Sequence, residues 1–370
     1  MNTAVKRVCH VTSVHPVDDH RILHKECVSL RDAGYDVTLI APREEDGVVG
    51  GIPVVALHAP ARNRLERMLR RPPAAYRAAL ALDADLYHFH DPELLPWGVR
   101  LARAGKRVVY DAHEDLPAQI RGKDWIHARV RARVADAVAQ LEEACVGRLD
   151  AVVSPSRSAL ERLRPHQPRV AHVANYPRLD ELRPAAHWQE RVRAACYVGG
   201  ITRVRGAREL VDAMAHARAE LQLAGAISPP ELRDELERSP GWQRVRYLGR
   251  VPQDRVRALL ARVKVGVIPL KPIRAYADAF PVKLFEYMAA GLPIVAIDVP
   301  RWRSVLDAHE CGISVPYGSP RRLGEAIAQL LDDDARAQAM GERARRAAER
   351  HYSWETQAAL LVDLYGELLS

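Results

Sequence analysis

The sequence has few cysteines, few aromatic residues and no long apolar segment. Its cysteines are Cys9, Cys27, Cys145, Cys196 and Cys311, with no CxxC pair among them. This pattern argues against a disulfide framework or a zinc site and favours a reducing compartment. No apolar run reaches the roughly 18 residues of a membrane span, and residues 1–11 lack the apolar core of a signal peptide. We therefore expect a cytoplasmic protein.

Glycine is missing from the first turn of the chain. Residues 5–14 have the pattern of a strand, 21–33 that of a helix ended by Gly34, and 36–41 that of a second strand. A dinucleotide-binding domain would carry Gly-x-Gly-x-x-Gly between the first strand and the helix. A nicotinamide-dependent dehydrogenase is therefore disfavoured, and we expect no bound cofactor.

The chain is long and mixed enough in composition for two globular α/β domains. It has 370 residues, of which 48% are apolar, whereas ordinary single domains are shorter. A polar segment around residues 179–193 reads as a linker between two βα series. We expect an N-terminal domain over 1–180, completed by a C-terminal helix over 353–370, and a second domain over 190–350.

An excess of basic residues predicts an anionic partner. The net charge is +8, which suits a nucleotide, a nucleic acid or an anionic lipid surface. Nucleic acid is disfavoured because aromatic residues, which would stack on bases, make up only 6% of the chain. In the basic stretch 61–71, Leu65, Met68 and Leu69 share one helix face. This helix either covers a sheet or rests on the inner face of an anionic membrane.

The most informative stretch runs from Asp278 to Ile297 and predicts a loop, a short helix and a buried strand. Pro281 suits a helix start, and Gly291 suits its end. Free backbone N–H groups at such a helix start attract phosphate. Glu286 in the first turns would repel a phosphate but could accept hydrogen bonds from a ribose diol. Asp278 could reach hydroxyl groups beyond the far phosphate, so this arrangement suits a sugar nucleotide.

A second candidate phosphate site follows the strand predicted over 194–198. Gly199 and Gly200 form a flexible turn, and Arg203 and Arg205 follow at the start of a helix. These groups suit a diphosphate clamp made of charge-assisted hydrogen bonds. Lys283 is a third candidate contact, with an ordinary solvated lysine as the alternative.

Histidines and aspartates also gather at predicted strand ends in the first half of the chain. His90 and His113 follow two strands, while His15, Asp19 and Arg21 lie in or near the first turn. The carboxyl ends of parallel strands line the ligand crevice in open α/β sheets. A lone histidine in such a place is more often a structural residue, so the residues alone leave both interpretations open.

Several of these segments resemble glycosyltransferase family 4. Asp278, Glu286 and the following Tyr-Met-Ala-Ala-Gly-Leu-Pro-Ile-Val-Ala resemble its Glu-x7-Glu signature, with aspartate in place of the first glutamate. The segments 15–21, 90–96 and 110–115 resemble a branch whose enzymes build bacterial surface polysaccharides.

The resemblance implies a GT-B architecture, in which two Rossmann-like domains face each other across a cleft and the C-terminal helix crosses back to the first domain. It implies that His113 lies against the donor sugar, that Glu286 binds the ribose and that Asp278 binds sugar hydroxyls. The remaining implied donor-binding residues are Gly199, Gly200, Arg203, Arg205, Gly249, Val251, Lys283 and Leu284. We expect His15, Asp19, Arg21 and His90 on the acceptor side.

The resemblance further implies a retaining transfer from a nucleoside-diphosphate sugar, with UDP or GDP as the carrier and no metal ion. The expected acceptor is a glycan, a lipid-linked glycan or a small molecule of secondary metabolism. No carboxylate of the first domain stands out as a nucleophile, which favours a front-face mechanism over a double displacement. The alternative is a sugar-nucleotide epimerase of the same architecture, which would need no acceptor.

Overall fold

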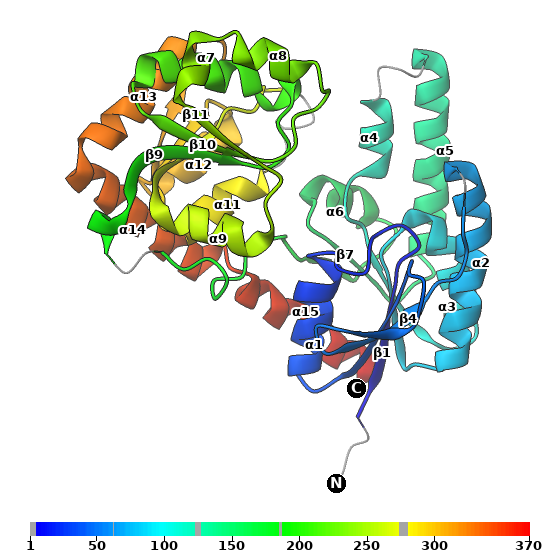
Figure 1. The fold of residues 1–370 in the computed structure, drawn as a ribbon. Helices are drawn as coiled ribbons and strands as arrows, with labels where there is room; N and C mark the ends of the chain where they lie inside the picture. The colour runs from blue at the N-terminus through cyan, green and yellow to red at the C-terminus, as the bar shows by residue number, and fades with distance from the viewer. Residues whose placement is uncertain (1–4, 62, 123–126, 185–186, 274–279) are drawn as a thin grey trace. The chain divides into compact units, whose positions relative to one another are not determined.

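The computed structural model describes residues 5–61, 63–122, 127–184, 187–273 and 280–370 (Figure 1). It consists of two compact units, one formed by 1–175 together with 355–370 and the other by 176–354. Each unit is built on one open, mainly parallel sheet with connecting helices. The predicted pair of Rossmann-like α/β domains is therefore confirmed.

The N-terminal unit contains an eight-stranded sheet in the order β3-β4-β2-β1-β5-β6-β7-β8. Its strands are β1 (Arg7–Val11), β2 (Asp36–Ala41), β3 (Gly47–Val49), β4 (Ile52–Ala56), β5 (Leu86–Phe89), β6 (Arg107–Asp111), β7 (Ala151–Ser154) and β8 (Val170–His172). Its helices include α1 (Val28–Asp32), α2 (Arg64–Leu82), α3 (Leu95–Arg103), α4 (Leu116–Arg121), α5 (Ala128–Val146) and α6 (Arg157–Leu163). Among the described strands of this sheet, β3 alone runs antiparallel to its neighbour, through a two-residue Gly50-Gly51 turn with positive φ at both glycines.

The expected helix over 21–33 differs from the structure. Residues Ile22–Cys27 form a π-helical turn, η1, which continues into α1. The N–H of Glu26 donates to the carbonyl of Arg21 at 2.9 Å, five residues back. This wider turn directs the charged side chains of Lys25 and Glu26 into the interior, where both are buried. Such single turns are rare and are frequently found at functional sites.

The C-terminal unit contains a parallel six-stranded sheet in the order β11-β10-β9-β12-β13-β14. Its strands are β9 (Val192–Val198), β10 (Glu220–Ala224), β11 (Val245–Gly249), β12 (Val263–Ile268), β13 (Ile294–Ile297) and β14 (Gly312–Val315). Its helices include η4 (Arg203–Arg205), α7 (Ala207–Ala217), α8 (Leu232–Glu237), α9 (Gln253–Arg262), α11 (Val282–Ala289), α12 (Pro300–Ala308), α13 (Pro320–Asp332) and α14 (Asp334–His351). The predicted helix and buried strand of the most informative stretch are α11 and β13.

The last helix, α15 (Trp354–Leu369), returns the chain to the N-terminal unit from Glu355 onward. Leu361, Tyr365 and Leu368 on this helix are buried, and the ring of Tyr365 lies 5.8 Å from that of Tyr35, just before β2. The predicted crossing of the C-terminal helix to the first domain is therefore confirmed.

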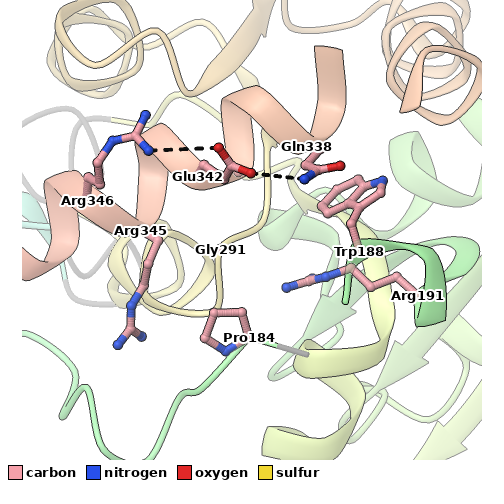
Figure 2. A pocket seen from close by; sticks show the side chains of 9 residues that line it. Pro184, Trp188, Arg191, Gly291, Gln338, Glu342, Arg345 and Arg346 are labelled. Atoms are coloured by element: carbon pink, nitrogen blue, oxygen red, sulfur yellow. Dashed lines mark hydrogen bonds and ion pairs between the residues drawn. The ribbon is translucent and has the colours of Figure 1, made fainter. Parts of the chain in front are cut away.

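A hollow of about 300 Å³ lies between the start of the C-terminal unit and α14 (Figure 2). Trp188 and Arg191 line one side, and Glu342 and Arg345 of α14 line another. It adjoins Gly291, beyond the C-terminal end of α11, whereas the predicted donor residues precede or lie within that helix. All five cysteines are free and buried. None of the helices in the described ranges is long and apolar enough to cross a membrane.

Candidate active site

Three glycines form a rim at the carboxyl ends of adjacent strands in the C-terminal unit. Gly199 follows β9, Gly225 follows β10 and Gly249 ends β11, with φ values of +130°, +143° and +65°. Backbone bonds tie them together: Gly225 N–H donates to the carbonyl of Gly249 at 2.7 Å. A Cβ on Gly225 would lie 1.9 Å from the carbonyl oxygen of Gly199. Glycine is needed here because neither the conformation nor the space admits a side chain.

Two cations lie at the Gly199 end of this rim. A Cβ on Gly199 would lie 2.5 Å from Nζ of Lys283, and one on Gly200 would lie 2.9 Å from Nη1 of Arg205. Burial lowers the pKa of Lys283 and Arg205 lowers it further, whereas Glu286 raises it. The structure thus brings Lys283 to Gly199, Gly200 and Arg205, which lie together much earlier in the sequence. Positive charge beside exposed backbone at strand ends is suited to a diphosphate.

Arg203 is directed elsewhere. Its guanidinium forms an ion pair with Glu235 on α8, with Nε 3.2 Å from the carboxylate. The neighbouring Gly206 has φ +71°, and a Cβ there would lie 1.8 Å from the carbonyl oxygen of Pro269. The tight turn at Gly206 therefore orients Arg205 toward the glycine rim, while Arg203 serves the contact with α8.

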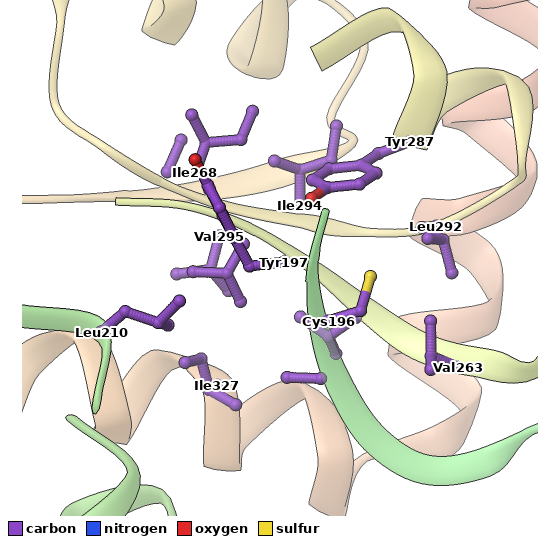
Figure 3. Packing of buried hydrophobic residues seen from close by; sticks show 14 of the residues in the cluster. Cys196, Tyr197, Leu210, Val263, Ile268, Tyr287, Leu292, Ile294, Val295 and Ile327 are labelled. Atoms are coloured by element: carbon purple, nitrogen blue, oxygen red, sulfur yellow. The ribbon is translucent and has the colours of Figure 1, made fainter. Parts of the chain in front are cut away.

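The helix α11 is fixed on the sheet by buried side chains, among them Leu284 and Tyr287. Tyr287 lies among the buried side chains of this unit (Figure 3). Its ring lies over Gly266 of β12, where a Cβ would be 2.4 Å from the ring, and its hydroxyl accepts a hydrogen bond from Val198 N–H at 3.4 Å. Pro281 precedes the first turn and leaves that end of the helix without a side-chain cap. Glu286 is half-buried, one turn from Lys283.

Two other predicted donor residues have different surroundings. Val251 packs against the core of the C-terminal unit, so its side chain is partly structural. Asp278 lies outside the described residues, as do all residues from 274 to 279.

In the N-terminal unit, the loop after β1 is organised by Asp91. This carboxylate accepts hydrogen bonds from the Thr12 hydroxyl at 2.9 Å and from Ser13 N–H at 2.6 Å. His15 lies between two carboxylates, with Nε2 3.5 Å from Asp91 and Nδ1 3.3 Å from Asp19. The hydrogen bond with Asp19 raises the pKa of His15, although burial opposes this effect.

Asp111, at the end of β6, connects the other predicted residues of this unit. Arg21 donates two hydrogen bonds to its carboxylate, at 2.8 and 3.1 Å. His113 Nε2 lies 3.4 Å from the same carboxylate and 3.2 Å from Nδ1 of His90, and the His113 ring stacks on His15 at 4.7 Å. Burial lowers the pKa of His113 to about 4, with Asp111 opposing.

The structure therefore gathers His15, Asp19, Arg21, His90 and His113 into one network within the N-terminal unit. Sequence reasoning did not assign a role to Gly225, or to Glu26, His10, His88 and Tyr365, which extend the network inward. A signal for the histidines existed: His88 and His90 occupy alternate positions of one strand and so share a face of the sheet. No pattern indicated Glu26, because a regular helix over residues 21–33 would direct its side chain differently from the π-helical turn.

Comparisons with known families agree with this architecture. Residues 21–175 match the model for glycosyltransferase family 4, and residues 193–333 match the model for glycosyl transferases group 1. The chain is 25% identical over 363 residues to a phosphatidyl-myo-inositol mannosyltransferase of Mycobacterium leprae, covering 91% of this chain and 89% of that protein. It is 30% identical over 148 residues to a D-inositol 3-phosphate glycosyltransferase of Corynebacterium aurimucosum, and that match spans 34% of the relative's length.

Solved structures show the same fold. Sucrose-phosphate synthase from Thermosynechococcus elongatus superposes with a TM-score of 0.75 at 19% identity, covering 98% of this chain and 99% of that one. The Anabaena protein HepE, solved in complex with UDP, superposes with a TM-score of 0.70 at 15% identity, covering 98% of this chain and 100% of that one. With both family models matched in sequence order on two Rossmann-like domains, this chain belongs to glycosyltransferase family 4 and has the GT-B fold.

Proposed function

We propose that this chain transfers a sugar from a nucleoside diphosphate to an acceptor hydroxyl with retention of anomeric configuration. The observation that carries the proposal is the pair of cations, Lys283 and Arg205, held over the Gly199–Gly200 backbone beside Glu286. The cations and the backbone N–H groups bind the diphosphate, and the carboxylate of Glu286 accepts hydrogen bonds from the ribose diol. HepE of Anabaena, which shares this fold, was solved with UDP and with UDP-glucose, which supports a nucleotide sugar as donor.

The proposed reaction proceeds on one face of the sugar. The bond between the anomeric carbon and the diphosphate oxygen breaks, the acceptor oxygen bonds to the same face of that carbon, and the acceptor proton passes to the departing phosphate. Lys283 and Arg205 stabilise the negative charge that develops on this phosphate. This chemistry requires no divalent ion, so the turnover rate should be the same with and without added Mg²⁺ or Mn²⁺.

In the N-terminal unit, two carboxylates already accept hydrogen bonds from neighbouring residues, which favours this mechanism over a covalent intermediate. Asp111 is bound by Arg21, and Asp91 by Thr12 and Ser13, so neither is free to attack the sugar. His113, kept neutral by its lowered pKa, is proposed to contact the donor sugar, with Asp278 binding its hydroxyls. His15, Asp19, Arg21 and His90 shape the acceptor side. An inverted anomer in the product, seen by NMR, would contradict the mechanism.

We propose a membrane-associated glycan or lipid-linked acceptor, reached from the inner face of the membrane. Phosphatidyl-myo-inositol mannosyltransferase, a relative over most of the chain, is named for a lipid acceptor. On α2, Met68 and Leu69 are exposed, with relative accessibilities of 44% and 67%, and Arg70 beside them is 62% exposed. Exposed apolar side chains next to basic ones favour binding to an anionic bilayer. A small-molecule acceptor is the alternative for the same donor chemistry.

The donor site is tested by a thermal-shift panel of UDP, GDP, ADP, dTDP and CMP against the wild type and Glu286→Gln. A ligand at about 100 times its dissociation constant adds roughly 2.7 kcal/mol of stability. One diphosphate should raise the wild-type melting temperature, and Glu286→Gln should lose most of that rise. If no diphosphate stabilises the wild type, the donor assignment fails. Consumption of the matching nucleotide sugar only when an acceptor is present would separate transfer from epimerisation.

A further inference from the structure

Three buried histidines share one face of the N-terminal sheet. His10 on β1 lies directly opposite His88 on β5 in the strand register, and His90 follows two positions later, so its side chain points the same way. The ring centroids lie 4.7 to 5.1 Å apart, with His90 stacked against both other rings and His10 tilted by 37° from His88. All three residues are at most 2% exposed. Burial of so many imidazoles in one place requires a polar partner.

That partner is Glu26, which the π-helical turn η1 directs at the histidines. Its Oε2 atom lies 3.9 Å from Nδ1 of His10 and 3.9 Å from Nε2 of His90, and these two nitrogens are 2.9 Å apart. One ring nitrogen of His88 completes a group of four ligand atoms that all lie within 4.8 Å of one another. In a tetrahedral site with metal–ligand bonds of about 2.1 Å, neighbouring ligand atoms are roughly 3.4 Å apart.

Several polar atoms of this group have no hydrogen-bond partner among the described residues. They are both carboxylate oxygens of Glu26 and Nε2 of His88. Glu26 is fully buried and forms an ion pair with Nε of Arg21 at 3.0 Å, and the same guanidinium group is also bound to Asp111. Two buried carboxylates thus share one guanidinium in this region. An additional cation or a proton is needed to balance them.

The remaining ring nitrogens are held from outside the group. The hydroxyl of Tyr365 on α15 lies 2.6 Å from Nδ1 of His88 and 3.3 Å from Nε2 of His10. Nδ1 of His90 lies 3.5 Å from the carboxylate of Asp111. Hydroxyl and carboxylate groups in these positions are the usual supports of metal-ligating histidines, because they fix the ring orientation and the tautomer.

We propose that His10, His88, His90 and Glu26 bind one divalent transition-metal ion of the Zn²⁺ type inside the N-terminal domain. Three imidazoles and one carboxylate suit zinc better than magnesium or calcium, which prefer oxygen ligands. The ion would join β1, β5 and η1, and through Tyr365 it would stabilise the docking of α15. Its role is structural, and its ligands do not include the cations proposed to bind the diphosphate.

The test uses the full-length protein and Zn²⁺ alone, without any substrate. The protein is stripped with dipicolinate, titrated with zinc against a chromophoric chelator, and its metal content is counted after gel filtration. The wild type should retain one zinc ion per chain and gain about 5–10 °C in melting temperature. Since loss of a supporting contact already costs 10–100-fold in metal affinity, Glu26→Gln should lose at least about 100-fold. Tyr365→Phe should show a smaller loss, and exposed His58→Gln should bind as the wild type does.

Retention of no zinc by the wild type, or equal zinc affinity in Glu26→Gln, would overturn the proposal and leave a shared proton as the balancing charge. If Glu26→Gln does not unfold cooperatively, Co²⁺ replaces zinc in the wild type. Tetrahedral Co²⁺ with nitrogen and oxygen ligands gives intense visible absorption bands, which the proposal requires. A spectrum of hexahydrated or surface-bound Co²⁺ would contradict it.

Discussion

The amine of Lys283 occupies the space that a side chain on Gly199 would need. These residues are 84 positions apart, yet a Cβ on the glycine would be 2.5 Å from Nζ of the lysine. The contact joins the turn after β9 to the first turn of α11, and the φ of +130° at Gly199 separately favours glycine there. It also places a partly desolvated cation beside backbone N–H groups, which is the arrangement expected of a phosphate site.

The two arginines of the loop before α7 should differ in their effect on diphosphate binding. Lys283→Met and Arg205→Gln should each weaken binding of the cognate nucleoside diphosphate by about 10–100-fold, because each removes a charge-assisted hydrogen bond worth roughly 1.5–3 kcal/mol. Arg203→Gln is the matched control and should cost less than about threefold, since Arg203 pairs with Glu235. Calorimetry with the diphosphate and with the bare nucleoside measures this. An equal loss for all three variants, or an equal loss for the nucleoside, would contradict the assignment.

Gly225 should be the least replaceable glycine of the rim. Gly225→Ala should lower the free energy of unfolding by about 2–4 kcal/mol, since it combines a positive φ with a clash against the Gly199 carbonyl. Gly318→Ala is a suitable comparison because φ there is +81° but no atom lies within 4 Å of the added Cβ. It should cost only about 1 kcal/mol. Denaturant titration distinguishes the two, and a smaller loss at Gly225 than at Gly318 would show that the rim is more adaptable than the structure indicates.

The His15–Asp19 pair should make stability depend on pH. Because its pKa is raised in the folded protein, protonated His15 stabilises the fold below the unfolded pKa of about 6.5, and this contribution disappears as pH rises through the folded pKa. His15→Gln should therefore destabilise the protein by about 0.5 kcal/mol more at pH 5.5 than at pH 9, a small effect because the pair is partly solvated. Exposed His58→Gln should show no such difference. A loss that is independent of pH would mean that His15 acts through packing alone.

Membrane binding should depend on the exposed apolar residues of α2. The double variant Met68→Glu and Leu69→Glu should lose most binding to vesicles that contain phosphatidylglycerol, as measured by co-sedimentation at low salt. Leu80→Glu on the same helix is the control, because Leu80 is 43% exposed. Arg71 is unsuitable for charge reversal, since its guanidinium hydrogen-bonds the carbonyls of Ser13 and Ala59. Leu65 also belongs to the predicted apolar face, but the structure does not describe its side chain. Equal vesicle binding by the double variant and by Leu80→Glu would show that Met68 and Leu69 do not form the membrane-binding surface.

The sequence by itself determined the two-domain α/β architecture, the return of the last helix and the family. The architecture follows from short-range patterns, which are apolar runs for buried strands and a period of 3.6 for helices. The family and the return of the last helix follow from the resemblance carried by Asp278, Glu286 and the residues up to Gly291. Patterns of this kind are local, so they survive without knowledge of the neighbours. The glycine-free first turn likewise argues against a dinucleotide site there.

Only the tertiary structure decided which polar residues meet. Arg203 faces α8, and Lys283 lies against Gly199. Within the C-terminal unit Gly225 connects the glycine rim, and within the N-terminal unit Asp111 connects the predicted polar residues. The tertiary structure also gathered His10, His88, His90, Glu26 and Tyr365 from four separate elements. Such groupings depend on strand register, on a π-helical turn and on a helix hundreds of residues away in the chain. Those are long-range consequences of packing, and no sequence period encodes them.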